Sequence, residues 1–160
     1  MKRHGLKVGI SFGLTSSIIT TIGLMIGLAS GTQERYVVII GILTAAIVDA
    51  LSDALGIHLS EESEATHAQK EIWFTSFATL FSKMFFSLIF LPAILFFPLN
   101  FSVIINIAFG FSLLFILSIF IAKEENEKAW KVVIEHLVIA TFVIILSHYI
   151  GILIKSLFQV

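Results

Sequence analysis

Long apolar runs alternate with short polar breaks along the whole chain, and this pattern predicts five membrane-spanning helices. The runs cover about residues 8–30, 36–58, 73–97, 101–122 and 132–154. Each is roughly twenty residues or longer, which suffices for a helix to cross a hydrocarbon layer about 30 Å thick. The breaks hold no long linker or low-complexity tract. The sequence therefore predicts an all-α integral membrane protein, with residues 1–160 forming a single five-helix transmembrane domain.

Composition agrees with this prediction. The chain is 58% hydrophobic and only 13% charged, with a mean hydropathy of +1.02, so a single soluble core is excluded. A formal net charge of −1 excludes the basic surface that nucleic-acid binding needs. The absence of cysteine removes disulfides, thiolate metal sites and cysteine nucleophiles. We expect the lipid bilayer as the main partner, no nucleic acid, and a multi-pass location that is the plasma membrane if the source is prokaryotic.

The distribution of positive charges predicts the orientation, because lysine and arginine in short loops are retained in the cytoplasm. One side of the predicted bundle collects seven of them, whereas the other holds Arg35 and Lys155. The seven are Lys2, Arg3, Lys7, Lys70, Lys123, Lys128 and Lys131. We therefore expect a cytoplasmic N-terminus and a C-terminus that is outside or lumenal.

The first span carries small residues at intervals of three and four, which places them on one helical face. They include Gly9, Gly13, Gly23 and Gly27. Such stripes let two membrane helices approach closely, so we expect these glycines to mediate helix packing. They also favour a homodimer.

The second span contains two acids one turn apart, Asp49 and Asp53, on a face shared with Ser52. A carboxylate in the bilayer costs at least about 2.5–3.5 kcal/mol, so it normally faces the bundle interior and marks an ion or proton path. A buried structural hydrogen bond or ion pair is the alternative. Two ionised carboxylates at this spacing repel, and a divalent cation or a shared proton would relieve the repulsion.

Acidic and imidazole side chains follow this span at its expected cytoplasmic mouth. They are Glu61, Glu62, Glu64 and His67. Mn²⁺ and Fe²⁺ accept both ligand types, so the group is a candidate for metal capture. A merely solvated acidic loop is the alternative.

Lys83 is the one basic residue deep within a predicted span. Asp49 lies ten residues before Leu59, and Lys83 lies eleven after Ile72, which puts both about 15–16 Å below the same membrane surface. An ammonium facing a carboxylate can stay charged there, so Lys83 is a possible charge partner of Asp49. The alternative is that its flexible stem reaches the headgroups. In the same span, Pro92 predicts a kink because it lacks a backbone donor.

Four segments together resemble the vacuolar iron transporter family. FGLTSS at 12–17 is similar to the family's Asp-Gly-Leu signature, and VDALSDALGIHLSEESE at 48–64 is similar to its second-span motif. LPAILFFP at 91–98 and SHYIG at 147–151 resemble elements of its third and fifth spans. The second-span match is the most specific of the four.

The resemblance implies a dimer of five-helix protomers that exports Fe²⁺ or Mn²⁺ from the cytoplasm, with proton antiport as the implied coupling and no tightly bound cofactor. Asp49 matches the family's second-span Asp, and Asp53 stands in place of a metal-contacting Met, which favours Mn²⁺. Phe12 and Ile57 replace acids of the family motif, and the long cytoplasmic helical insert is missing. The chain resembles a short, divergent member.

The alternative function is a non-transporting membrane scaffold that retains the family fold, as the replacements at Phe12 and Ile57 would suggest. An enzyme is not predicted. Intramembrane aspartyl proteolysis needs two Asp on facing helices, whereas Asp49 and Asp53 share one helix.

Overall fold

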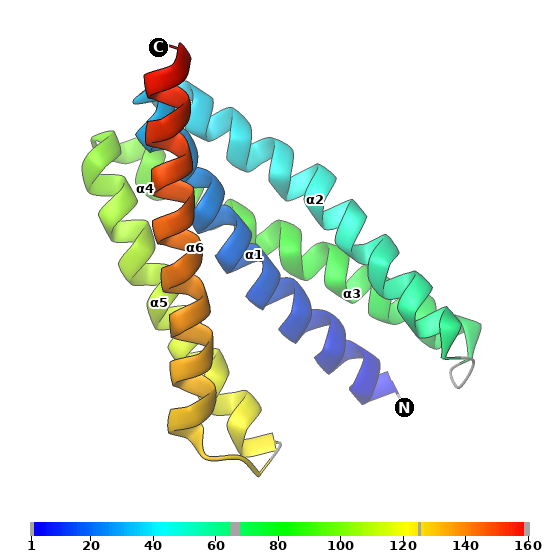
Figure 1. Ribbon diagram of the computed structural model, residues 1–160. Coiled ribbons are helices and arrows are strands. Elements are labelled where there is room, and N and C mark those ends of the chain that lie inside the picture. The colour runs from blue at the N-terminus through cyan, green and yellow to red at the C-terminus, as the bar shows by residue number, and fades with distance from the viewer. Residues whose placement is uncertain (1, 65–67, 125, 159–160) are drawn as a thin grey trace. The chain divides into compact units, whose positions relative to one another are not determined.

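The computed structural model describes residues 2–64, 68–124 and 126–158 of the chain. These residues form six helices and no strand (Figure 1). The helices are α1 (Lys2–Thr32), α2 (Arg35–Ser63), α3 (Gln69–Leu88), α4 (Leu91–Phe96), α5 (Leu99–Glu124) and α6 (Ala129–Phe158). The all-α prediction is confirmed for the described part of the chain.

Among the described residues, five segments are long and apolar enough to cross a membrane, as predicted. They are Gly5–Thr32, Arg35–Ser63, Gln69–Phe96, Leu99–Glu124 and Ala129–Phe158. The helices run past the predicted spans; α2, for example, continues through the polar turn from His58 to Ser63. Hydropathy marks only the apolar stretch of a helix, because backbone hydrogen bonding carries the helix on into polar residues. The direction in which the helices cross stays a prediction.

The third span is interrupted near its end, as Pro92 predicted. Helix α3 ends at Leu88, and α4 begins at Leu91 with the proline in its first turn. Proline has no N–H to donate to the carbonyl of Leu88, so the helix cannot continue unbroken. At the break, the buried amide of Asn106 on α5 donates a 2.9 Å hydrogen bond to the carbonyl of Phe90.

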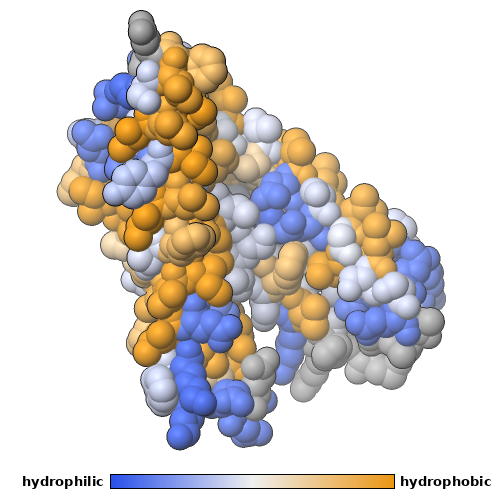
Figure 2. Space-filling view, in the orientation of Figure 1, coloured by the Kyte–Doolittle hydropathy of each residue, from blue (hydrophilic) through white to orange (hydrophobic). Residues whose placement is uncertain are grey.

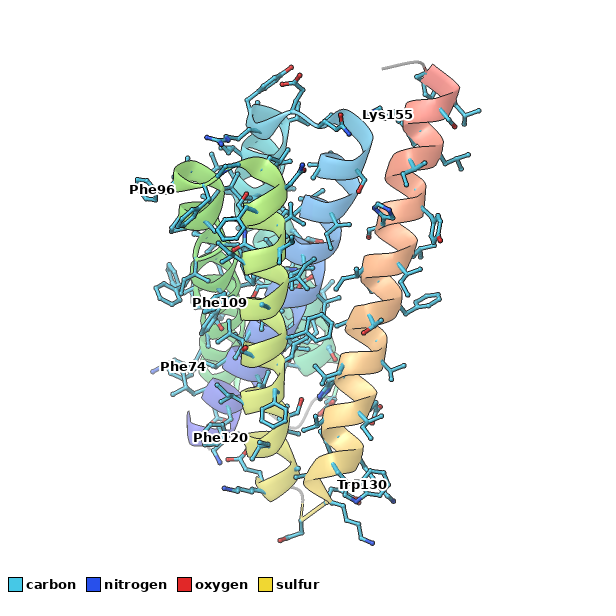
Figure 3. The ribbon with its side chains drawn as sticks, turned by 90° about the vertical axis from the view of Figure 1, so that its left-hand side faces the viewer. Phe74, Phe96, Phe109, Phe120, Trp130 and Lys155 are labelled. Atoms are coloured by element: carbon cyan, nitrogen blue, oxygen red, sulfur yellow. The ribbon has the colours of Figure 1, made fainter. Side chains whose placement is uncertain are left out.

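Large apolar side chains remain exposed along the helices. Phe120 and Phe142 are 63% and 64% exposed. Figure 2 shows hydrophobic residues over most of the helical surface in view, with hydrophilic residues toward helix ends and in a patch away from them. In Figure 3, Phe96 points away from the ribbon, and Trp130 and Lys155 mark opposite ends of α6. Soluble monomers rarely expose apolar surface on this scale, so lipid is the surrounding that fits the chain.

The internal contacts of the chain divide it into two compact units. The first unit holds the described residues up to Ser17 and those from Ile42 to Ile89, and it therefore contains the start of α1, most of α2, and α3. The second holds Ile18–Gly41 and the described residues from Phe90 onward, and it contains the end of α1 with α4, α5 and α6. Each is considered by itself below.

The glycines of α1 pack against other helices of the same chain. In the first unit, a Cβ built on Gly9 would lie 2.7 Å from the carbonyl oxygen of Thr75 on α3, and one on Gly13 would lie 2.8 Å from that of Thr79.

In the second unit, a Cβ on Gly23 would lie 2.8 Å from Val143, and one on Gly27 would lie 3.5 Å from the carbonyl of Ser147, both on α6. The expected helix packing is present, but it is intramolecular. The stripe therefore no longer supports a homodimer, which stays a prediction.

Candidate ion site in the first unit

A line of polar residues on α3 is buried in the first unit. It includes Thr75, Thr79 and Lys83, spaced four apart and hence on one face of the helix. The hydroxyls of Thr75 and Thr79 donate to backbone carbonyls four residues earlier, so both are satisfied within α3. The glycines of α1 cover this face closely. Lys83 is thereby held away from the surface.

Lys83 is fully buried and binds both acids of the second span. Its Nζ lies 2.6 Å from Oδ2 of Asp49 and 2.5 Å from Oδ2 of Asp53. The contact with Asp49 is the one expected from their equal depth. The contact with Asp53 was not expected, because residue counting fixes the depth of a side chain but not the rotation of its helix.

Ser16 on α1 completes this cluster. Lys83 Nζ donates to the hydroxyl of Ser16 over 2.9 Å, and that hydroxyl donates to Oδ2 of Asp53 over 2.6 Å. The ammonium therefore donates hydrogen bonds to Asp53 and Ser16 and forms an ion pair with Asp49. Ser16 belongs to the small-residue stripe of the first span, and its part in the site depends on how α1 packs against α2 and α3.

The cluster carries more negative than positive charge. With both carboxylates ionised and Lys83 protonated, the net charge of the cluster is −1. The side chain of Asp49 is 36% exposed and that of Asp53 is 21% exposed, so Asp49 is the more accessible carboxylate. A cation entering from outside the cluster would meet Asp49 first.

The other predicted ion-path and metal-capture residues within the described part of the chain do not join the cluster. Ser52 is exposed on α2 and is not among the partners of Lys83. Glu61 and Glu62 are consecutive in the last turn of α2 and therefore point about 100° apart, and Glu64 follows the helix. His67 lies outside the described residues. Within the part that the structure describes, no three Asp, Glu or His side chains come together as a metal-binding group.

Two further polar side chains, His58 of α2 and Glu71 of α3, lie near the start of α3. His58 Nδ1 lies 3.2 Å from the hydroxyl of Ser76, and its ring packs on Trp73 with the centroids 4.5 Å apart. Both contacts join α2 to α3. Glu71, in the first turn of α3, has a buried carboxylate oxygen with no hydrogen-bond partner among the described residues.

Glu71 also begins the polar line, because Thr75, Thr79 and Lys83 follow it at steps of four. The line is twelve residues long, or about 18 Å along the helix axis. It connects the start of α3 with the ion cluster.

The chain matches no protein-family model, no curated protein and no solved structure.

Proposed function

We propose that this chain is a membrane transporter that moves a divalent cation, Mn²⁺ or Fe²⁺, out of the cytoplasm. The observation that carries the proposal is the buried Lys83 ammonium shared by Asp49 and Asp53 inside membrane-spanning helices. Ionisable groups at this depth are costly and usually mark an ion path. The chain is not proposed to be an enzyme, and the cation is its cargo and not a resident cofactor.

Lys83 is the internal counter-ion in this proposal. With no metal bound, its ammonium separates two carboxylates that would otherwise repel each other. A divalent cation carries the charge needed to neutralise both, so it can take the place of the ammonium between Asp49 and Asp53. The flexible stem of Lys83 allows its nitrogen to withdraw. The more exposed carboxylate of Asp49 is where such a cation would first contact the cluster.

The oxygen ligands favour Mn²⁺ among the candidate metals. Asp49, Asp53 and the hydroxyl of Ser16 offer oxygen atoms alone, and Mn²⁺ accepts such hard ligands readily. Proton antiport, implied by the family resemblance, belongs to the same proposal.

Flux through proteoliposomes tests this function. We expect purified protein to carry Mn²⁺ across the vesicle membrane, read by a metal-quenched dye inside, with a pH dye reporting proton counter-movement. Asp49→Asn and Asp53→Asn each keep the size of the side chain and remove its charge, so each should abolish the flux. Glu34→Gln changes an exposed acid outside the cluster and is the matched control. Unchanged flux in both Asp variants would overturn the proposal.

A membrane scaffold is the second candidate, and the internal partners of Lys83 favour it. The ammonium already has Asp49, Asp53 and Ser16 as partners, as in an ion pair that only holds helices together. In that case wild-type vesicles would carry none of Mn²⁺, Fe²⁺, Co²⁺, Zn²⁺ or Mg²⁺ faster than protein-free vesicles, while the Asp variants would lose stability.

A further inference from the structure

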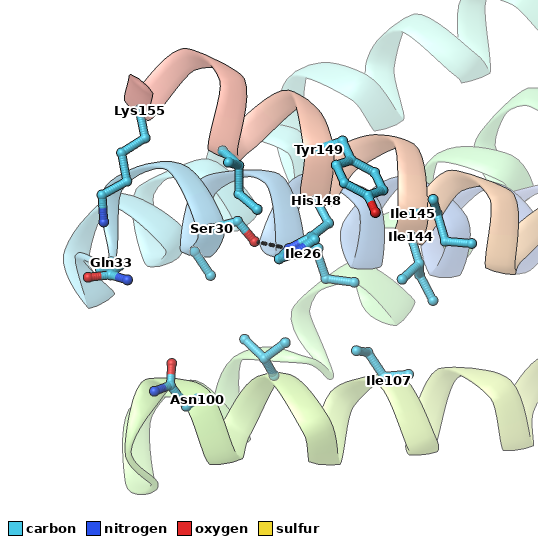
Figure 4. A pocket seen from close by; sticks show the side chains of 13 residues that line it. Ile26, Ser30, Gln33, Asn100, Ile107, Ile144, Ile145, His148, Tyr149 and Lys155 are labelled. Carbon is cyan, nitrogen blue, oxygen red and sulfur yellow. Dashed lines mark hydrogen bonds between the residues drawn. The ribbon is translucent and has the colours of Figure 1, made fainter. Parts of the chain in front are cut away.

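A groove of about 670 Å³ lies in the second unit, among the end of α1, the start of α5 and the end of α6 (Figure 4). This volume falls in the range of roughly 300–1,000 Å³ typical of small-molecule sites. The groove has no residue in common with the ion cluster, which belongs to the first unit.

The two ends of the groove differ in polarity. Gln33, Asn100 and Lys155 line it where the three helices end or begin, whereas Ile107, Ile144 and Ile145 line it further along the helices (Figure 4). From Lys155 to Ile144 the groove follows eleven residues of α6, or about 16 Å. Because helix ends lie at the membrane surface, the polar end meets the headgroup region and the apolar end reaches into the hydrocarbon.

The polar side chains at the rim are available for a ligand. Within the described residues, the side chains of Lys155, Gln33 and Asn100 make no hydrogen bond or ion pair. His148 and Ser30, deeper in the groove, are joined to each other by a 2.7 Å hydrogen bond. The rim therefore offers one positive charge and two amides to a ligand, whereas His148 and Ser30 are already hydrogen-bonded to each other.

We propose that this groove binds an anionic membrane lipid. Its phosphate lies at the rim, where Lys155 supplies the opposite charge and Gln33 and Asn100 supply amide donors. One acyl chain follows Ile107, Ile144 and Ile145. The orientation of the groove matches that of a lipid in the bilayer, with the charged end at the surface and the apolar end inward. A free phosphate would leave the apolar end unfilled.

Native mass spectrometry of the full-length protein in mild detergent tests this inference. The probes are phosphatidylglycerol and phosphatidylcholine with identical acyl chains, and glycerol 3-phosphate as the headgroup without chains. We expect more retention of phosphatidylglycerol than of phosphatidylcholine, and none of glycerol 3-phosphate. Lys155→Gln should lower phosphatidylglycerol retention about fivefold, because one Lys near an anionic headgroup contributes at about that level.

Two matched controls separate the groove from general effects. Lys131→Gln removes a positive charge from the other end of α6 and should leave retention unchanged. Val103→Trp fills the groove and should abolish retention of both lipids, whereas Ile104→Trp, at an exposed neighbouring position outside the groove, should not.

Equal retention in wild type, Lys155→Gln and Val103→Trp would overturn the inference. So would binding of glycerol 3-phosphate alone. A dimer that disappears in Val103→Trp without any lipid adduct would also overturn it and assign the groove to a second copy of the chain.

Discussion

The Lys83 ammonium forms ion pairs with Asp49 and Asp53 and donates a hydrogen bond to Ser16. Removing one partner of a buried ion pair costs more than the pair contributes, because the remaining charge keeps the cost of its desolvation. We expect Lys83→Met to destabilise the protein by about 3 kcal/mol. Asp53→Asn in the same chain should restore part of the lost stability, since it removes one of the two carboxylates that Lys83→Met leaves without a counter-ion.

A double-mutant cycle measures this coupling by thermal unfolding in detergent. We expect a coupling energy of about 1–3 kcal/mol between Lys83 and Asp53. The cycle with Asp49→Asn should give a smaller value, because Asp49 is 36% exposed and water partly replaces its partner. If the stability changes of the single variants simply added in both cycles, the ion pairs of Lys83 with Asp49 and Asp53 would be contradicted.

Some of this cluster could be predicted from the sequence, because a charge deep in an apolar span must find a partner at the same depth. That argument identified Asp49 and Lys83. It could not predict that Lys83 also reaches Asp53, or that Ser16 joins them, since both depend on helix rotation and on the packing of α1. Among the described residues, the acids at the end of α2 form no metal-binding group, because the consecutive Glu61 and Glu62 point about 100° apart.

At the scale of the elements, the close contact between α1 and α3 depends on glycine. A Cβ on Gly9 would lie 2.7 Å from both the carbonyl oxygen of Thr75 and Cβ of Ala78, so the helices would have to separate. Gly56 on α2 has nothing within 4 Å of such a Cβ. We expect Gly9→Ala to destabilise by about 1–3 kcal/mol through overpacking, and Gly56→Ala to be neutral or to stabilise by up to about 1 kcal/mol through helix propensity.

The same thermal unfolding measurement compares the two variants. Gly27→Ala should also be tolerated, because its Cβ would lie at an ordinary contact distance of 3.5 Å from Ser147. If Gly9→Ala and Gly56→Ala shifted the unfolding temperature equally, the close packing of α1 on α3 would be contradicted.

The number of spans and the break at Pro92 were predictable, because hydropathy and the missing proline donor are local properties. The partners of each span were not. A stripe of small residues predicts that some helix packs closely against it, but not which one. The first half of the stripe on α1 packs against α3, and the second half packs against α6. Because both halves pack within the chain, the stripe no longer supports a homodimer.

At the scale of the whole molecule, the direction of transport depends on the orientation of the chain in the membrane. The bias of lysine and arginine predicts that α2 starts outside and ends in the cytoplasm. With 29 residues, α2 is about 43 Å long and exceeds the hydrocarbon thickness of about 30 Å, so it is long enough to place its two ends on opposite sides. Glu34, just before it, and Ser63, its last residue, are both exposed.

Single cysteines at these two positions report the orientation, because the chain has no cysteine of its own. In intact bacterial cells carrying the protein in the plasma membrane, a membrane-impermeant maleimide should label Glu34→Cys and not Ser63→Cys. Both should react once the membrane is permeabilised, which shows that each site is accessible. Labelling of Ser63→Cys alone in intact cells would reverse the orientation. The proposed export would then become import, and the rim at Lys155 would face the cytoplasmic leaflet, where anionic lipids are concentrated in many membranes.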